Sequence, residues 1–357
     1  MEIGLIGLPG SGKTTIFNAL TGQAAATAPS GRIEANQAVV AVPDPRVDKL
    51  AEIFDPKKTT HATIHYVDIV GLQVTEGSGL PTQALVLLGT TEMLLVVLRG
   101  FDGGLGTPDP AGDAESIDLE MTVSDLQKVE NRFERIQKQI QRVAGAERDA
   151  LKLELQALEK AKGPLEAGQA LRELDFTDEE RKAIRGFQFL TLKPALYLVN
   201  TESVEQAADP ASIAPLQDRA ARPNTGAAAL AGEIEQEIAQ LPPEDRAEFL
   251  ATYGIEKPGS DRIIKATYDL LGMMSFLTAG KDEVRAWTVR RGASAPEAAG
   301  VIHTDFQKGF IRAEVASFDA LSRLGTMKAC RENGELRTEG KGYIMQDGDV
   351  VEFLFSR

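Results

Sequence analysis

The residues with the clearest chemical potential lie near the start of the chain. Residues 7–14 read GLPGSGKT, which matches the pattern G-x-x-x-x-G-K-[ST]. Glycines allow backbone N–H groups to surround phosphate oxygens without side-chain clashes. An apolar run at 2–6 precedes the loop, and apolar residues at helical spacing follow it. The pattern therefore predicts a phosphate-binding loop between a buried strand and a helix whose positive end faces the same anion.

Roles within this loop follow from its chemistry. Lys13 would reach the β- and γ-phosphates of a bound nucleotide, so it is a candidate catalytic residue. The hydroxyl of Thr14 would bind Mg²⁺. We predict that the loop contacts to the nucleotide come from Leu8, Pro9, Gly10, Ser11, Gly12, Lys13, Thr14 and Thr15.

A second motif distinguishes among phosphate-binding proteins. Residues 62–70 read ATIHYVDIV, a buried strand, and Asp68 begins a D-x-x-G pattern that ends at Gly71. About 55 residues after a phosphate loop, this pattern is the switch signature of GTPase-type proteins. Asp68 would hold Mg²⁺ through water, and the amide of Gly71, a second candidate catalytic residue, would meet the γ-phosphate. Leu72 then stands where Ras-like enzymes carry the glutamine that orients water, and Gln73 is one position late, so we predict slow hydrolysis.

Composition and charge restrict the class of protein. The 357 residues are 43% apolar and 26% charged, which is typical of soluble globular domains, and the length predicts two or three of them. Every apolar run is too short to span a membrane, and no secretory signal precedes the loop, so we expect a cytoplasmic protein without membrane contact. Cys330 is the only cysteine, which excludes an internal disulfide and a cysteine-built zinc site.

The negative charge is unevenly distributed. The whole chain carries −14, which argues against non-specific binding to nucleic acid. From Thr278 to the end, however, 12 basic and 12 acidic side chains balance. This tail could therefore approach a polyanion such as ribosomal RNA, with Arg290, Arg291, Lys308 and Arg312 as its candidate basic residues.

The middle of the chain predicts a helical hairpin. Apolar residues follow a heptad seam at Leu126, Val129, Phe133, Ile136, Ile140 and Val143. Ser124 with Gln127 resembles a capping box, so we expect the first arm to begin there and to be about 30 Å long. The pattern breaks near residue 145, continues on a second arm and ends at Gly163-Pro164. Its charged outer face is either merely solvated or a contact surface.

The remaining segments complete an α/β domain and a small tail. Thr177 with Glu180 predicts a capped short helix, and LTLKPALYLVN a strand that returns to the first sheet, so the hairpin is an insertion. Helices are expected at 233–241, 245–250 and 261–271. The tail predicts strands at EVRAWTV and GFIRAEVASF, a helix capped by Ser294, and a strand, Asp-Gly turn and strand at YIMQDGDVVEFLF. Strands around one helix suggest a β-grasp module.

With these elements in place, the chain resembles the YchF/Obg-like ATPase family of P-loop proteins nearly end to end. The most specific stretches are VVAVPDPRVDKLAEIF, VDIVGL, DRAEFLATYGIEKPGSDRIIKATYDLLG and the tail from FLTAGKDEVRAWTV to YIMQDGDVVEF. The resemblance implies a Ras-like α/β nucleotide domain at 1–117 and 187–277. It also implies an inserted helical coiled coil at 118–186 and a TGS-like β-grasp domain at 278–357.

Several positions depart from the family pattern. Gly10 and Ser11 stand where the family usually has Asn and Val, and Arg32 stands where its first switch carries a threonine hydroxyl. The base-reading motif, usually N-V-N-E, is matched by residues 200–203, which read NTES. The resemblance implies that Asn200 and Glu202 bind the nucleotide base, with a preference for ATP over GTP. The chain is similar to a divergent member of this family.

The leading hypothesis is a Mg²⁺-dependent ATP- or GTP-binding protein that hydrolyses its nucleotide slowly. The resemblance implies that it switches between nucleotide states and associates with the ribosome or ribosomal subunits, and we expect a monomer. An alternative is a nucleotide-binding scaffold with negligible turnover, in line with Arg32 and Leu72. A third is a small-molecule kinase, suggested by PGSGKTT, but the hairpin lacks the arginine cluster that a kinase lid would need.

Overall fold

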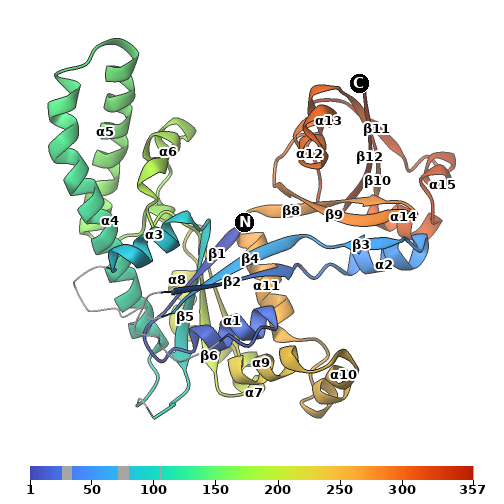
Figure 1. Ribbon diagram of the computed structural model, residues 1–357, viewed down its shortest axis with the longest axis horizontal. Helices are drawn as coiled ribbons and strands as arrows, with labels where there is room; N and C mark the ends of the chain where they lie inside the picture. The colour runs from blue at the N-terminus through green and yellow to red at the C-terminus, as the bar shows by residue number, and fades with distance from the viewer. Residues whose placement is uncertain (26–33, 71–79, 105, 357) are drawn as a thin grey trace. The chain divides into compact units, whose positions relative to one another are not determined.

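The computed structural model describes residues 1–25, 34–70, 80–104 and 106–356, and the chain forms two compact units. The first unit contains residues 1–40 and 65–263. The second contains residues 41–64 and 264–357. Each unit has a sheet of its own, and each is described separately below (Figure 1).

The first unit is built on a six-stranded sheet in the order β2-β4-β1-β5-β6-β7. The strands are β1 (Glu2–Ile6), β2 (Glu34–Ala41), β4 (Thr63–Val70), β5 (Met93–Gly100), β6 (Ala195–Thr201) and β7 (Thr225–Leu230). The pairs from β4 through β7 are all parallel. Continuous apolar strands such as MLLVVLRG are buried on both faces, as parallel sheets require. The carboxyl ends of β1, β4 and β6 therefore meet at one edge.

Helices cover this sheet and close its core. They are α1 (Lys13–Thr21), α3 (Thr82–Thr90), α7 (Val204–Ala208), α8 (Gln217–Ala220), α9 (Gly232–Gln240) and α10 (Pro243–Thr252), with short 3₁₀ turns at Leu171–Glu173, Arg185–Phe187, Pro210–Ser212 and Ala214–Leu216. The core cluster includes Ile6, Val96 and Tyr197 from three neighbouring strands. The helices expected around residues 233–241 and 245–250 are confirmed by α9 and α10, and the strand expected after residue 190 by β6.

A long helical hairpin interrupts the first unit between β5 and β6. Helices α4 (Pro110–Ile140) and α5 (Gly145–Glu166) pack against each other, and Figure 1 shows them as an antiparallel pair. The expected start at Ser124 is wrong. Asp109 accepts a hydrogen bond from the amide of Gly112 and caps α4, so the helix has 31 residues and is about 46 Å long.

Part of the seam is formed as the heptad spacing predicts, but Val143 lies beyond the end of α4, and Pro164, expected to end the second arm, lies within α5. Val129 packs with Ala157, Leu158 and Ala161, and Phe133 is partly buried against the same cluster. Arg132 donates to both carboxylate oxygens of Glu154 across the two helices. Helix α6 (Asp178–Ile184) follows, and its Thr177–Glu180 capping box is confirmed. The hairpin is therefore a packed structural element with its charged face outside.

The second unit has a six-stranded sheet in the order β11-β10-β12-β8-β9-β3. The strands are β3 (Lys58–Thr60), β8 (Met273–Ala279), β9 (Glu283–Arg290), β10 (Phe310–Ser317), β11 (Arg337–Glu339) and β12 (Asp349–Phe355). The helices are α2 (Pro45–Phe54), α12 (Ala295–Ile302), α13 (Thr304–Lys308), α14 (Phe318–Leu324) and α15 (Met327–Glu332). Helix α11 (Gly259–Leu270) contributes residues to both units. The helix expected after Ser294 is confirmed as α12, with Ser294 as its N-cap.

Two expectations for the second unit differ from the structure. The strand expected at YIMQ is reduced to one bridge between Ser294 and Ile344. The turn after it is formed, and the carboxylate of Asp349 accepts the amide of Gln346 there. The boundaries expected at 277/278 and within residues 1–117 also differ. Strand β8 begins at Met273, and residues 41–64 belong to the second unit through α2 and β3. The remaining domain boundaries stay predictions.

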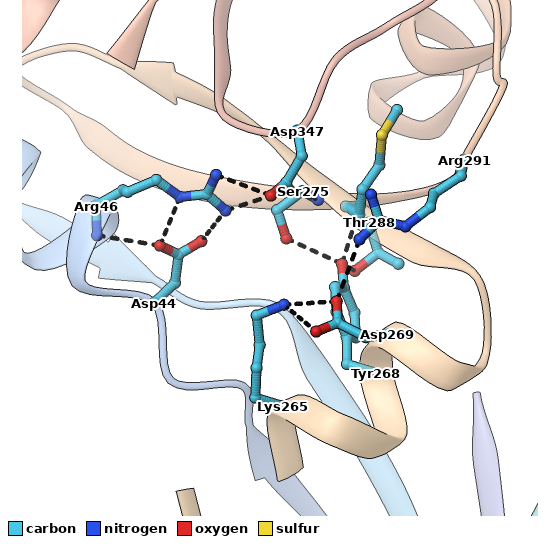
Figure 2. Close-up of polar contacts among 10 residues, drawn as sticks. Asp44, Arg46, Lys265, Tyr268, Asp269, Ser275, Thr288, Arg291 and Asp347 are labelled. Atoms are coloured by element: carbon cyan, nitrogen blue, oxygen red, sulfur yellow. Dashed lines mark hydrogen bonds and ion pairs between the residues drawn. The ribbon is translucent and has the colours of Figure 1, made fainter. Parts of the chain in front are cut away.

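A polar network explains why residues 41–64 belong with the tail (Figure 2). The guanidinium of Arg46 lies between the carboxylates of Asp44 and Asp347 and bonds to both. These acceptors raise the pKa of Arg46. Asp347 also accepts from the amide of Ser275 on β8. The hydroxyl of Tyr268 bonds to Ser275 as well, so one network joins α2, α11, β8 and the loop before β12.

Candidate nucleotide-binding site

The phosphate-binding loop between β1 and α1 has the geometry that its glycines permit. Gly10 and Gly12 have φ of 79° and 84°, in the left-handed region that favours glycine. A Cβ at Gly12 would lie 2.2 Å from Nδ2 of Asn200, so a larger residue cannot stand there. Gly12 is the N-cap of α1, and no side chain within the described residues caps this helix. The positive end of α1 is therefore available to an anion.

Lys13, the first residue of α1, lies over the loop. Its Nζ donates to the carbonyl oxygens of Gly7 at 3.0 Å and Leu8 at 3.2 Å. Burial lowers the pKa of Lys13, and the nearby carboxylate of Asp68 opposes this shift. These two bonds hold the ammonium group against the carbonyl oxygens at the start of the loop.

Thr14 and Asp68 meet where β4 ends beside the loop. The Thr14 hydroxyl donates to Oδ2 of Asp68 at 2.8 Å, and Nδ2 of Asn36 on β2 lies 3.5 Å from the same oxygen. The other oxygen, Oδ1, is buried and has no hydrogen-bond partner among the described residues. Burial raises the pKa of Asp68, against the hydrogen bond from Thr14 and the charge of Lys13. An orphaned carboxylate oxygen beside a hydroxyl fits Mg²⁺, which prefers oxygen ligands and is bound by few protein groups.

Asn200, at the carboxyl end of β6, braces the loop. Its Nδ2 donates to the carbonyl of Ser11 at 3.1 Å, and its Oδ1 accepts from the amide of Gly232 at 3.1 Å. The side chain is buried, with 4% of its surface exposed. The side chain of Asn200 thus links the phosphate loop to the start of α9, and one amide hydrogen and one lone pair remain for a ligand.

The other predicted site residues occupy different positions. Leu8 packs against the core cluster, so only its backbone faces the loop, whereas Pro9 is exposed. Ser11 is buried at 1% exposure, with its hydroxyl oxygen unpartnered among the described residues, and Thr15 lies half-buried on α1. Glu202 is exposed just beyond β6. Gly71, Leu72, Gln73 and Arg32 lie outside the described residues.

Sequence reasoning missed two residues that shape the site. Asn36 lies on β2, and its contact with Asp68 depends on the pairing of β2 with β4, which no local sequence pattern reveals. Asn18 is a buried polar residue on α1 that bonds to both backbone groups of Ala25 and to Gln236 of α9. A polar residue on the apolar face of α1 was the only available signal.

Two family profiles match the chain. Residues 2–146 match MMR_HSR1, described as "50S ribosome-binding GTPase". Residues 273–356 match YchF-GTPase_C, described as "Protein of unknown function". The first match contains the phosphate loop and Asp68, and the second begins at the start of β8.

Full-length relatives decide the family. The chain is 42% identical to the "Ribosome-binding ATPase YchF" of Escherichia coli O157:H7 over 99% of both chains. The chain belongs to the YchF family. It is 39% identical to the YchF protein of Bacillus subtilis (strain 168), over 100% of this chain and 99% of that relative. It is 35% identical to "Obg-like ATPase 1" of Oryza sativa subsp. japonica, over 100% of this chain and 92% of that relative.

The fold also agrees with a solved YchF structure. The "Structure of the Schizosaccharomyces pombe YchF GTPase" superimposes with a TM-score of 0.82 at 30% identity, over 99% of this chain and 97% of that chain. This confirms the expected class, an α/β P-loop domain with a helical region and a C-terminal domain. Among the helices that the structure describes, none has the length and apolar character needed to cross a bilayer.

Proposed function

We propose that this YchF-family chain is a Mg²⁺-dependent nucleoside triphosphatase that hydrolyses ATP or GTP slowly and associates with ribosomes in the cytoplasm. The observation that carries the proposal is the contact between the Thr14 hydroxyl and one carboxylate oxygen of Asp68, whose other oxygen has no partner among the described residues. This contact lies beside the N-terminus of α1, which no described side chain caps. Family membership supports the nucleotide chemistry. We further propose that the chain acts as a monomer.

Each site residue would act in a defined way. The loop amides from Gly10 to Thr15 would bind the phosphates, Leu8 and Pro9 would line the loop, and Lys13 would neutralise charge on the β- and γ-phosphates. Thr14 and Asp68 would hold Mg²⁺, which supplies charge neutralisation at the phosphate oxygens when bound. Gly71 would contribute its amide at the γ-phosphate. Leu72 has no group that orients water, so we infer slow turnover, which a single-turnover assay would distinguish from a scaffold without turnover.

The geometry of Asn200 supports weak selection between purine bases. Its single remaining amide hydrogen could meet N7, an acceptor that adenine and guanine share. Glu202 is exposed beyond β6, and the position after it is Ser203 instead of an acidic residue that could pair with N1–H and N2–H₂ of guanine. By family resemblance we favour ATP over GTP.

The expected result is that nucleotide-stripped protein binds GTP no more than about tenfold more tightly than ATP. Direct titration of both Mg²⁺–nucleotides by calorimetry measures this ratio. Asn200→Ala should weaken the affinities for ATP and GTP to the same extent. It removes the hydrogen bond that supports Ser11 in the phosphate loop as well as the proposed base contact. A hundredfold preference for GTP in the parent protein would contradict the proposal. Glu205→Ala, at an exposed position on α7, serves as the matched control.

The ribosome-binding YchF relatives support a ribosomal partner. A ribosome is a polyanion, so the docking face should be locally basic. In the second unit Arg290, Arg291, Lys308 and Arg312 are all exposed. Arg291 pairs with Asp269 at 3.3 Å (Figure 2), and Arg312 lies 3.9 Å from Glu314, so part of this charge is already balanced.

We expect the protein to co-sediment with ribosomes at low salt, with binding that depends on the nucleotide and weakens as salt rises. Changing the four basic residues of the tail together to Ala should weaken co-sedimentation further. The matched control changes four exposed basic residues of the hairpin, Arg135, Lys138, Arg142 and Lys152, to Ala. Loss of binding only in that control would place the docking face on α4 and α5. Protein that stays in the supernatant with every nucleotide would refute the ribosomal partner.

A further inference from the structure

A small cavity of about 20 Å³ lies at the base of the helical hairpin. Its walls come from α4, the segment that follows α5, β6, α8 and the start of β7, all within the first unit. Polar side chains form much of the wall, including three arginines, Arg172, Arg219 and Arg222. The nucleotide site does not use any of these residues.

Two of the three arginines are paired with carboxylates. Nε of Arg219 donates to Oδ2 of Asp118 at 2.9 Å, and the other oxygen of Asp118 accepts from the hydroxyl of Tyr197. Nη1 of Arg222 lies 3.3 Å from the carboxylate of Glu173. These pairs neutralise each other, so two cations and two anions of the wall balance.

Arg172 is the one arginine of the cavity wall that pairs with neither of these two carboxylates. It has only 2% of its surface exposed. Its Nε donates to the carbonyl oxygen of Thr191 at 3.1 Å, whereas its Nη2 is buried without a partner among the described residues. Three guanidinium groups against two carboxylates give the lining a formal charge of +1. A buried charge that lacks a counter-ion is costly, so this arrangement favours an anion in the cavity.

We propose that the cavity binds a monatomic monovalent anion, chloride in the cell, held by the guanidinium of Arg172. The volume exceeds the 10–15 Å³ or so that one water needs, and a chloride ion is only slightly larger than water. Chloride accepts several hydrogen bonds and balances the excess charge, which a neutral water cannot do.

The position of the cavity gives the anion a structural effect. Arg172 follows α5, its amide and its Nε both bond to Thr191, and Thr191 in turn bonds to Asp125 of α4. Tyr197 lies on β6, three residues before Asn200. A bound anion would therefore stabilise the packing of the hairpin base on β6, the strand that carries Asn200. This role is independent of the proposed nucleotide and ribosome binding.

The first test compares thermal unfolding of the full-length protein in sodium chloride and sodium gluconate at equal ionic strength. Chloride should raise the unfolding midpoint saturably, by roughly 2–5 °C at concentrations well above its dissociation constant. Arg172→Met should abolish this chloride-specific increment. Arg135→Met, at an exposed position on α4, should keep it. An increment that persists undiminished in Arg172→Met would overturn the proposal.

The second test uses the unaltered protein, so it also decides the case if Arg172→Met fails to fold. Crystals grown or soaked in bromide should give an anomalous peak within hydrogen-bond distance of Nη2 of Arg172. A cavity without anomalous signal at saturating bromide, together with equal midpoints in chloride and gluconate, would mean that it holds water, and the proposal would fail.

Discussion

Replacing Lys13 by alanine is expected to weaken Mg²⁺–ATP binding by at least about tenfold. The ammonium group lies over the phosphate loop, bonded to the carbonyls of Gly7 and Leu8, and would move to the β- and γ-phosphates. A charge-assisted hydrogen bond contributes about 1.5–3 kcal/mol, and 1.4 kcal/mol is a tenfold change in affinity. Calorimetric titration of nucleotide-stripped protein measures the loss.

The control for this prediction separates affinity from folding. Lys49→Ala, at an exposed position on α2, removes the same charge far from the loop in sequence and should leave the affinity unchanged. Urea denaturation of Lys13→Ala beside the parent protein shows whether a loss of affinity is accompanied by a loss of stability. Equal affinities of Lys13→Ala and the parent protein would refute the assigned role.

The proposed binding of Mg²⁺ by Thr14 and Asp68 can be tested with the same titration. Asp68→Asn keeps an acceptor for the Thr14 hydroxyl but removes the carboxylate charge. Nucleotide affinity in EDTA should then match the parent, whereas the increase on adding Mg²⁺ should be lost. A parent protein whose affinity does not depend on Mg²⁺ would remove the reason for placing the ion between Thr14 and Asp68.

The phosphate loop was predictable from sequence because its function depends on local geometry. Residues 7–14 must curl around an anion between a strand and a helix, and few residue types allow that path. The structure places Gly10 and Gly12 in the left-handed region that the motif requires. The parallel strands could also be predicted from the sequence, because a strand that is buried on both faces has a continuous run of apolar residues.

Contacts between distant segments were not predictable in this way. Ser124 has the pattern of a helix cap, yet it lies inside α4, where its hydroxyl donates to the carbonyl of Glu120 and accepts the amide of Leu80. The partner that explains this serine is 44 residues away. The same holds for Arg46, whose partner Asp347 lies 301 residues further along, so nothing near residues 41–64 indicated the second unit.

The role of Asn200 was predicted only in part. The sequence motif indicated a base contact, but the structure uses both ends of the carboxamide to join Ser11 to Gly232. A motif records which residue is needed at a site and not how many partners it has. The close approach of Gly12 to Asn200 shows that the loop and the base motif form one packed unit.

Replacing Asp125 by alanine is expected to destabilise the nucleotide-free protein by about 3–5 kcal/mol. Asp125 of α4 is fully buried, and burial raises the pKa of its carboxyl group. The carboxylate accepts hydrogen bonds from the amides of Leu190 and Thr191, and from the hydroxyl of Thr191. Nζ of Lys128 adds a contact at 3.3 Å. Alanine leaves the two amides and the Thr191 hydroxyl without this acceptor, and each buried orphan costs about 1–3 kcal/mol. Lys128 keeps its bond to the carbonyl of Gln188.

The large effect follows from where these donors lie. Leu190 and Thr191 precede β6, so Asp125 is the point at which the hairpin is tied to the sheet that carries Asn200. Urea denaturation measures the loss, and faster hydrogen exchange at the amides of residues 190 and 191 should accompany it. Asp149→Ala, at an exposed position on α5, should change stability by less than about 0.5 kcal/mol. If Asp125→Ala unfolds at the same urea concentration as Asp149→Ala, the carboxylate does not hold the hairpin, and its burial is compensated elsewhere.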